Sequence, residues 1–286
     1  MTALCLAHLP EPSAPIRPLP EGATDCHSHV ILPEADHPFV ANRSYTPPPA
    51  TLAQYKALHA RLGIERAVIV QPSVYGTDNT VTLQAIAGYG SNCRGIAVVD
   101  ADVPLAELKR FDAGGIRGAR INMLFAGGIG LDDLEPLAHR IADLGWHFQL
   151  LIDGPTLAGL ETRLANLPVQ VVIDHMGHVQ TKDGMAQAGF EALRRLVARG
   201  NTWVKLSGNY RMSRQRPTFD DVVPFAKALI AENPDHMVWG TDWPHPAMQD
   251  FMPDDGTLVD ALDAYVSDGA ERERILVDNP AQLYGF

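Results

Sequence analysis

The chain has 286 residues, of which 46% are hydrophobic and 20% charged, a composition typical of a globular protein with a substantial core. Its formal net charge of −11 at pH 7 argues against any general attraction to nucleic acid or to an anionic membrane surface. No apolar run approaches the ~20 residues of a membrane span. Neither nucleic acid nor a membrane is therefore an expected partner.

The N-terminal stretch is rich in proline, with five prolines in the first 21 residues and no basic segment. This pattern predicts an extended arm over 1–22 rather than a secretion signal. Cys5, Cys26 and Cys93 are odd in number and lack CxxC spacing, which argues against a disulfide framework and structural zinc. We expect a cytoplasmic protein, and nothing in the composition indicates its oligomeric state.

From residue 23 onward, runs rich in Val, Ile and Leu alternate with longer amphipathic stretches, as in strand-helix units around a parallel sheet. Strands are predicted at 23–29, 67–72, 94–99, 115–121, 147–152, 169–175, 202–206 and 237–241. Helices are predicted at 51–62, 79–89, 105–113, 134–144, 157–165, 188–199, 219–232, 257–267 and 270–276. Eight such units favour an α/β fold, a single-domain (β/α)8 TIM-like barrel over 23–286, rather than an open doubly wound sheet.

In such a barrel the active site lies where the strands end. His27 and His29 end the first strand and point to one face, because side chains alternate along a strand. His175 and Asp242 end two further strands. Together they could hold a single divalent metal such as Zn²⁺, or they could polarise a substrate oxygen. The alternative is that the histidines only bond backbone carbonyls.

Asp242 is the candidate general base, because a carboxylate beside imidazoles at a barrel mouth can take a proton from water. The alternative is a structural aspartate in an ion pair. Asp174 immediately precedes His175, so alternation predicts that it faces the opposite way and has a structural role.

Candidate substrate contacts follow from the remaining strand ends and the first loop. Arg120 and Arg211 carry planar guanidinium groups suited to a carboxylate, although either could form a surface ion pair. Tyr45 could cover the pocket or pack within its loop. Ser73 and His245, at two other strand ends, complete the predicted substrate-binding set.

These residues fall within motifs that resemble the amidohydrolase superfamily, in the branch containing 2-pyrone-4,6-dicarboxylate lactonase. The resemblance extends from Thr24 to Phe286. It rests on the segments 25–29 (DCHSH), 43–47 (RSYTP), 76–79 (GTDN), 118–122 (GARIN), 174–177 (DHMG), 240–246 (GTDWPHP), 252–256 (MPDDG) and 277–280 (VDNP). It implies a distorted TIM barrel that hydrolyses a lactone, with a small anionic lactone as partner and no cofactor required.

The resemblance also implies roles for the candidate residues. Asp242 would activate water, while His27, His29 and His175 would polarise the lactone carbonyl. The positions Tyr45, Ser73, Arg120 and Arg211 would hold the carboxylates and ring oxygens of the substrate.

The fourth and fifth strand ends bear on the number of metal ions. Binuclear members of the superfamily use a carboxylated lysine or a glutamate there, and usually a histidine. This chain has Arg120 and Asn122 on the fourth strand and 150–153 (LLID) on the fifth. A guanidinium would repel Zn²⁺, which argues against two metals and leaves a one-metal site open.

The chain also departs from the pyrone lactonase pattern. Small residues at 126–128 (AGG) replace a second arginine, Leu151 replaces a tyrosine, and His178 replaces another arginine. These changes remove contacts to at least one carboxylate. We therefore expect a smaller, reduced or monocarboxylated lactone rather than the dicarboxylated pyrone.

Three other functions compete with lactone hydrolysis. A sugar-acid lactone isomerase resembling galactarolactone isomerase could use the same polarised carbonyl and base. A metal-dependent hydrolase or decarboxylase would use the histidines as ligands. A sugar-acid binding protein without activity would need the arginines, but has little use for a carboxylate among three histidines.

Overall fold

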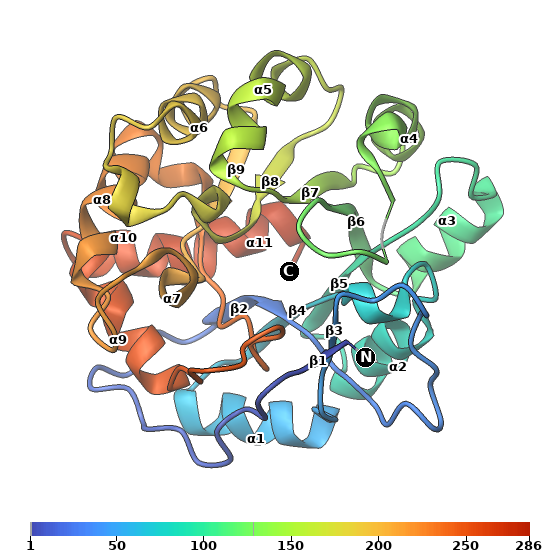
Figure 1. Ribbon diagram of the computed structural model, residues 1–286, viewed down its shortest axis with the longest axis horizontal. Coiled ribbons are helices and arrows are strands. Elements are labelled where there is room, and N and C mark those ends of the chain that lie inside the picture. Colours follow the sequence, from blue (N-terminus) through green and yellow to red (C-terminus); the bar gives the residue numbers. More distant parts are fainter. Residues whose placement is uncertain (1, 128) are drawn as a thin grey trace.

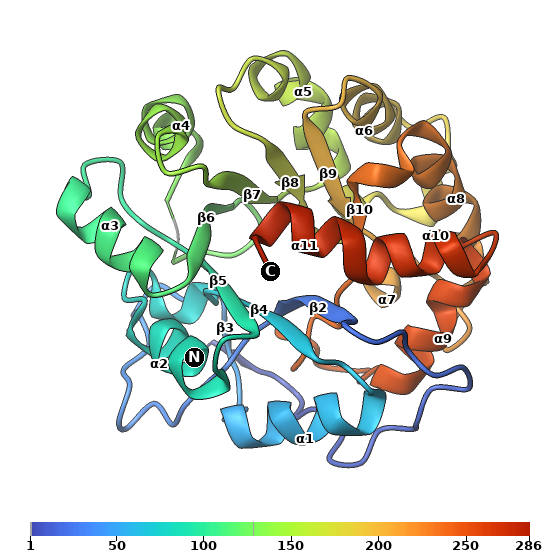
Figure 2. The same cartoon turned by 180° about the vertical axis from the view of Figure 1, so that it is seen from behind.

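The computed structural model describes residues 2–127 and 129–286, and it shows a ring of parallel strands surrounded by helices (Figures 1 and 2). The strands hydrogen-bond in chain order from one edge of the sheet to the other. They are β2 (Thr24–Ser28), β4 (Arg66–Val70), β5 (Cys93–Ala97), β6 (Ile116–Asn122), β7 (His147–Leu151), β8 (Val171–Ile173), β9 (Thr202–Lys205) and β10 (Met237–Val238). The predicted single-domain TIM-like barrel is confirmed.

The outer helices fall close to their predicted positions. They are α1 (Leu52–Leu62), α2 (Thr80–Tyr89), α3 (Leu105–Ala113), α4 (Leu134–Ala142), α5 (Gly154–Ala165), α6 (Ala188–Ala198), α8 (Val223–Glu232), α9 (Asp255–Tyr265) and α10 (Gly269–Glu273). The short helices α7 (Asn209–Met212) and α11 (Asn279–Tyr284) were not predicted. Pro280 argued against a helix at α11, because proline usually ends a helix. Here it lies in the first turn, where proline is tolerated because backbone N–H groups have no intrahelical acceptor there.

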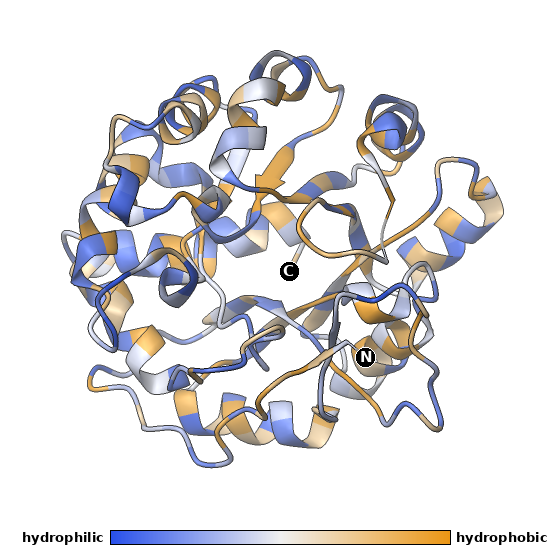
Figure 3. Ribbon diagram, in the orientation of Figure 1, coloured by the Kyte–Doolittle hydropathy of each residue, from blue (hydrophilic) through white to orange (hydrophobic). Residues whose placement is uncertain are grey.

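The core has two parts, one between strands and helices and one inside the barrel. Figure 3 shows central strands of mixed hydropathy, orange in β8 and bluer in β2, surrounded by helices that carry both apolar and polar sides. In the interior, Tyr284 of α11 packs with Cys26, Val68 and Trp203. Figure 2 shows α11 crossing that end of the barrel. One end of the barrel is thus closed by α11, and the site lies at the other.

The barrel closes at a seam between β2 and the segment after β10. The Cys26 N–H donates to Trp239 O at 2.9 Å, and the Asp242 N–H donates to His27 O at 2.8 Å. Gly240 permits this approach, since a Cβ there would lie 2.6 Å from His27 N. The seam therefore sets the first-strand histidines beside Asp242.

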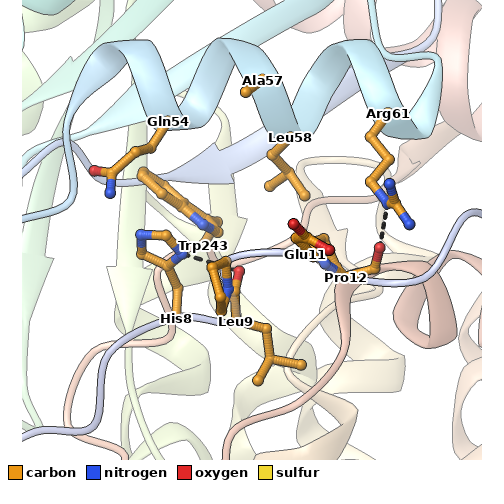
Figure 4. A pocket seen from close by; sticks show the side chains of 10 residues that line it. His8, Leu9, Glu11, Pro12, Gln54, Ala57, Leu58, Arg61 and Trp243 are labelled. Carbon is orange, nitrogen blue, oxygen red and sulfur yellow. Dashed lines mark hydrogen bonds between the residues drawn. The ribbon is translucent and has the colours of Figure 1, made fainter.

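The N-terminal arm lies against the same region. Its strand β1 (Ala3–Leu4) pairs with β3 (Tyr45–Thr46) in the loop that carries Tyr45. Further along, the arm and α1 enclose a surface pocket in which His8 lies 4.8 Å, ring to ring, from Trp243 (Figure 4). The arm thus packs against Trp243, which directly follows Asp242 in the chain. Within the described residues, no helix has the length and apolar character needed to cross a membrane.

Candidate active site

The structure brings the four predicted catalytic residues together at one end of the barrel. His27 Nε2 lies 3.3 Å from His29 Nε2. Asp242 Oδ1 lies 3.6 Å from His29 Nε2 and 3.7 Å from His27 Nε2. Asp242 Oδ2 lies 3.6 Å from His175 Nε2. All four side chains are almost fully buried, so their charges act in a poorly screened environment.

The two oxygens of Asp242 have different surroundings. Oδ2 accepts hydrogen bonds from the Tyr210 hydroxyl at 2.6 Å and from Arg211 Nε at 2.8 Å. Oδ1 accepts no hydrogen bond from any described residue and faces the histidine nitrogens. Burial alone would raise the pKa of Asp242, but Arg211 and the histidines outweigh it and hold that pKa well below the ordinary range. Asp242 is thus an ionised carboxylate with one free basic oxygen.

Hydrogen bonds at Nδ1 fix the character of the histidine Nε2 atoms. His29 Nδ1 lies 2.7 Å from Val70 O, which can only accept, so Nδ1 carries the proton and Nε2 has a lone pair. His175 Nδ1 lies 2.8 Å from Ser207 Oγ, which can donate to it and leave a proton on Nε2. Burial lowers the pKa of both rings and keeps them neutral. His29 therefore suits accepting a proton, whereas His175 suits polarising a carbonyl.

Asp174 does not face away from the site, contrary to the prediction from alternation. Its Oδ2 accepts from Arg120 at 3.1 Å, and its Oδ1 lies 3.2 Å from His27 Nδ1. The strand β8 ends at Ile173, and His175 and Met176 then adopt left-handed φ values of 52° and 49°. Alternation does not apply to such a turn, so Asp174 and His175 both reach the interior.

Two further polar residues below the histidines had no predicted role. Lys205 and Gln149 are fully buried inside the barrel. Lys205 Nζ donates to Gln149 Oε1 at 2.8 Å, and Gln149 Nε2 donates to Asp174 Oδ2 at 3.1 Å. The sequence signal for Lys205 was its position at the end of a strand, and that for Gln149 was a polar side chain between Phe148 and Leu150.

A small pocket opens above the histidines and Asp242, with about 270 Å³ of space. Its lining residues are His29, Tyr45, Arg120, Asn122, Phe125, Leu151, His175, His178, Arg211, Asp242 and Pro246. This space includes solvent at the open mouth, so the enclosed part of the pocket is smaller still. The pocket suits a small ring with anionic or polar substituents.

The predicted substrate contacts divide into two groups. Tyr45, Arg120 and Arg211 line the pocket. Ser73 lies behind Tyr45, and its hydroxyl donates to the Tyr45 hydroxyl at 3.3 Å. Ser73 therefore supports Tyr45 and does not line the pocket.

His245 also lies outside the pocket, contrary to its predicted role as a substrate contact. The ring is fully buried, with Nδ1 3.1 Å from the Tyr210 hydroxyl and Nε2 3.2 Å from Asp255 Oδ1. The chain turns through left-handed φ values of 65° at Asp242 and 61° at His245. This turn carries the imidazole behind Asp242, where it supports Tyr210.

Two polar atoms at the pocket have no hydrogen-bond partner among the described residues, Arg120 Nε and His178 Nδ1. Nearby, Gly127 has a φ of 112°, and a Cβ there would lie 2.3 Å from Ser73 O. Position 127 therefore has no room for the larger side chain that the family pattern expects in this loop, and Gly128 lies outside the described residues. Leu151 is buried in the pocket wall.

Three of the four predicted metal ligands, His27, His175 and Asp242, have donor atoms that suit one divalent ion in type and spacing, and His29 lies outside this set. His27, His175 and Asp242 can present ligand atoms within 4.8 Å of one another. This fit requires lone pairs on His27 Nε2 and on His175 Nε2, and hence the protons of both rings on Nδ1, where Ser207 Oγ would accept from His175.

Comparison with known proteins places the chain in a family. A family model described as Amidohydrolase matches residues 24–286. A 4-sulfomuconolactone hydrolase of Rhizobium radiobacter is 40% identical, covering 96% of this chain and 93% of the relative. A 2-pyrone-4,6-dicarboxylate hydrolase of Comamonas testosteroni is 38% identical with the same coverage.

Two further relatives extend the comparison. A D-galactarolactone isomerase of Agrobacterium fabrum is 32% identical over 95% of this chain and 94% of its own. A crystal structure of an Agrobacterium tumefaciens protein in its apo form superposes with a TM-score of 0.87 at 31% identity, covering 97% of this chain and 99% of the other. The chain therefore belongs to the amidohydrolase family, in the branch that contains 2-pyrone-4,6-dicarboxylate hydrolase.

Proposed function

We propose that this protein is a hydrolase that opens a carboxylate-bearing lactone, with water activated by Asp242. The observation that carries the proposal is the free Oδ1 of Asp242, which faces the histidines at the floor of a pocket lined by two arginines. A carboxylate so placed can take a proton from water. The lactone-hydrolase relatives at 38% and 40% identity support the same reaction.

The proposed reaction begins with a water hydrogen-bonded to Asp242 Oδ1. As the water oxygen bonds to the lactone carbonyl carbon, Asp242 takes its proton, and His175 Nε2–H stabilises the negative charge on the carbonyl oxygen. The ring C–O bond then breaks, and the leaving oxygen takes the proton back from Asp242. The products are one carboxylic acid, which ionises in solution, and one hydroxyl group.

The pocket supports a substrate with a single carboxylate near Arg120 and Arg211. Both arginines line the pocket, and the buried Arg120 Nε has no hydrogen-bond partner among the described residues. The apolar wall at Phe125 and Leu151 offers no partner for a second anionic group. A muconolactone-like or reduced lactone thus fits better than a dicarboxylated pyrone.

No cofactor is required in the proposed reaction. If one divalent ion did bind, His27, His175 and Asp242 would hold it, and it would supply Lewis-acid polarisation of the carbonyl. We further propose a cytoplasmic location, because the three cysteines are free thiols. The net charge of −11 supports small molecules rather than nucleic acid or membranes as partners.

An indicator assay tests the proposed function. Muconolactones, a 4-sulfomuconolactone, 2-pyrone-4,6-dicarboxylate and sugar-acid lactones are mixed with the protein in weak buffer, with and without added Zn²⁺. We expect acid release from at least one monocarboxylated lactone. Absence of acid release from every lactone would contradict the proposal, and a changed NMR spectrum without acid would indicate an isomerase.

The pH dependence of activity tests the link between Arg211 and Asp242. Asp242 acts in its ionised form, which is lost as pH falls through its pKa. Replacing Arg211 by Met removes the main influence that lowers this pKa, while burial still raises it. We expect the acid limb of the kcat profile to move to higher pH in Arg211→Met.

The control for Arg211→Met is Arg216→Met. Arg216 is a half-exposed residue in the segment after α7, and its side chain pairs with Asp250. Its acid limb is expected to match that of the wild type. An unchanged limb in Arg211→Met would show that the guanidinium does not set the pKa of Asp242.

Leu151 offers a test of substrate choice. Leu151→Tyr would place a hydroxyl in the pocket wall, where it could donate to a second carboxylate. We expect the kcat/KM ratio of dicarboxylated to monocarboxylated lactone to rise by about tenfold or more. Leu105→Tyr on α3, where Leu105 is 52% exposed, is the control and should leave the ratio unchanged. An unchanged ratio in Leu151→Tyr would remove this position from the account of specificity.

A further inference from the structure

A buried amine below the histidines has all of its donor positions occupied. Lys205 is fully buried, and its Nζ donates to Cys26 O at 2.8 Å and to Gln149 Oε1 at 2.8 Å. Two more acceptors lie within reach of Nζ, His27 Nδ1 at 3.2 Å and Asp174 Oδ1 at 3.4 Å. Of these two, His27 Nδ1 has the hydrogen-bond geometry, whereas Asp174 Oδ1 forms no hydrogen bond with any described residue. An ammonium group has three N–H bonds and no lone pair, so His27 Nδ1 must accept.

Asp174 is the competing partner for His27 Nδ1, because a carboxylate would accept a proton from that nitrogen. Asp174 Oδ1 lies 3.2 Å from Nδ1, yet it forms no hydrogen bond with any described residue. The other oxygen of Asp174 is held by Arg120 and Gln149 at 3.1 Å each. The carboxylate is near the ring but outside the direction of an Nδ1–H bond.

We propose that Lys205 is a positioning residue that holds the proton of His27 on Nε2 and thereby keeps this nitrogen from binding a metal ion. With Nδ1 accepting from Lys205, His27 Nε2–H donates to His29 Nε2 at 3.3 Å. His29 Nδ1–H in turn donates to Val70 O at 2.7 Å. The proton positions form one continuous chain from Lys205 through both histidines to the backbone.

The same chain opposes metal binding even though the donor spacing suits an ion. A metal ligand must offer a lone pair on Nε2, so His27 would need its proton on Nδ1. That proton would then point at the N–H groups of Lys205, which have no lone pair to receive it. Metal entry therefore requires Lys205 to release His27 and Asp174 to move into line.

The metal affinity of Lys205→Met tests this role. Methionine keeps the length of the side chain but donates nothing, so His27 Nδ1 is free to turn its proton toward Asp174. We expect the Zn²⁺ affinity, measured by competition with a chromophoric chelator and by elemental analysis, to rise by about 10- to 100-fold. Lys109→Met, at an exposed residue of α3, is the surface control.

Lys205→Gln separates the donor from the charge, because the amide keeps an N–H group but carries no charge. We expect its Zn²⁺ affinity to stay close to that of the wild type. If Lys205→Gln gained affinity as Lys205→Met does, charge repulsion would be the cause and the proposal would be overturned. Unchanged affinity in a folded Lys205→Met would overturn it as well.

The wild-type protein provides a measurement that does not depend on the folding of any variant. Two-bond ¹⁵N–¹H correlation spectra distinguish protonated from unprotonated ring nitrogens. We expect His27 to carry its proton on Nε2 and His29 on Nδ1. Detection of His27 as the Nδ1–H tautomer would overturn the proposal. These readouts need no substrate, so they separate a failure of this role from a failure of lactone hydrolysis.

Discussion

Asp242→Asn is expected to lower kcat by about 10²- to 10⁴-fold, the usual contribution of a general base. The amide has nearly the shape of the carboxylate, and its oxygen can still accept from Tyr210 and Arg211 at Oδ2. At the Oδ1 position, however, a neutral NH₂ group cannot take a proton from water. The loss should therefore fall on kcat, with a smaller effect on KM.

The control for this variant is Asp250→Asn, in the same loop, where the Asp250 side chain is 80% exposed. It should retain wild-type kcat. Thermal unfolding of both variants should stay close to that of the wild type. Retention of more than a tenth of wild-type kcat by Asp242→Asn would exclude Asp242 as the base.

Asp25→Ala is expected to lower the free energy of unfolding by about 3–5 kcal/mol, the cost of removing one partner from a buried charged network. Asp25 is fully buried at the seam between β2 and β10. It accepts from the Thr241 N–H at 2.9 Å, the Thr241 hydroxyl at 2.6 Å and the Tyr55 hydroxyl at 3.0 Å. Alanine would leave these donors unpaired at the closure of the barrel.

Asp36→Ala is the matched control, because Asp36 is exposed in a loop. Urea unfolding should show a change of less than about 0.5 kcal/mol for this variant. Asp25→Ala should also lose activity at urea concentrations below its unfolding midpoint, where it is still folded, because the seam places His27 beside Asp242. A stability loss for Asp25→Ala as small as that for Asp36→Ala would show that this carboxylate does not close the barrel.

Much of the fold and part of the site could be predicted because both follow from local pattern. Buried parallel strands are apolar on both faces and stand out between amphipathic helices, as in α4, where Leu134, Leu137, Ala138 and Ile141 form the buried stripe. His27 lies in β2 and His29 directly follows it, and alternation placed both correctly although the pairing of β2 with β4 shifts register between Asp25 and Ser28. Asp242 followed from its position at the end of the last strand.

The errors arose where the backbone leaves regular geometry. Val172 lies in the barrel interior, so Asp174 also points inward, and the left-handed turn that starts at His175 brings His175 to the same side. A second left-handed turn after β10 carries His245 behind Asp242. The position of Lys205 at a strand end was evident from the sequence, but its role was not, for another reason. Its role depends on Gln149 and Asp174, which come from two other strands, and such a contact has no counterpart in local sequence.

Hydrolysis in H₂¹⁸O tests the central claim most directly. The wild-type protein is incubated with a lactone on which it acts, and the product mass is read after a single turnover. Attack of Asp242-activated water predicts a product heavier than the lactone by one molecule of H₂¹⁸O, with one ¹⁸O in the new carboxylate. A product that has the mass of the lactone and contains no ¹⁸O would contradict hydrolysis and identify an isomerase.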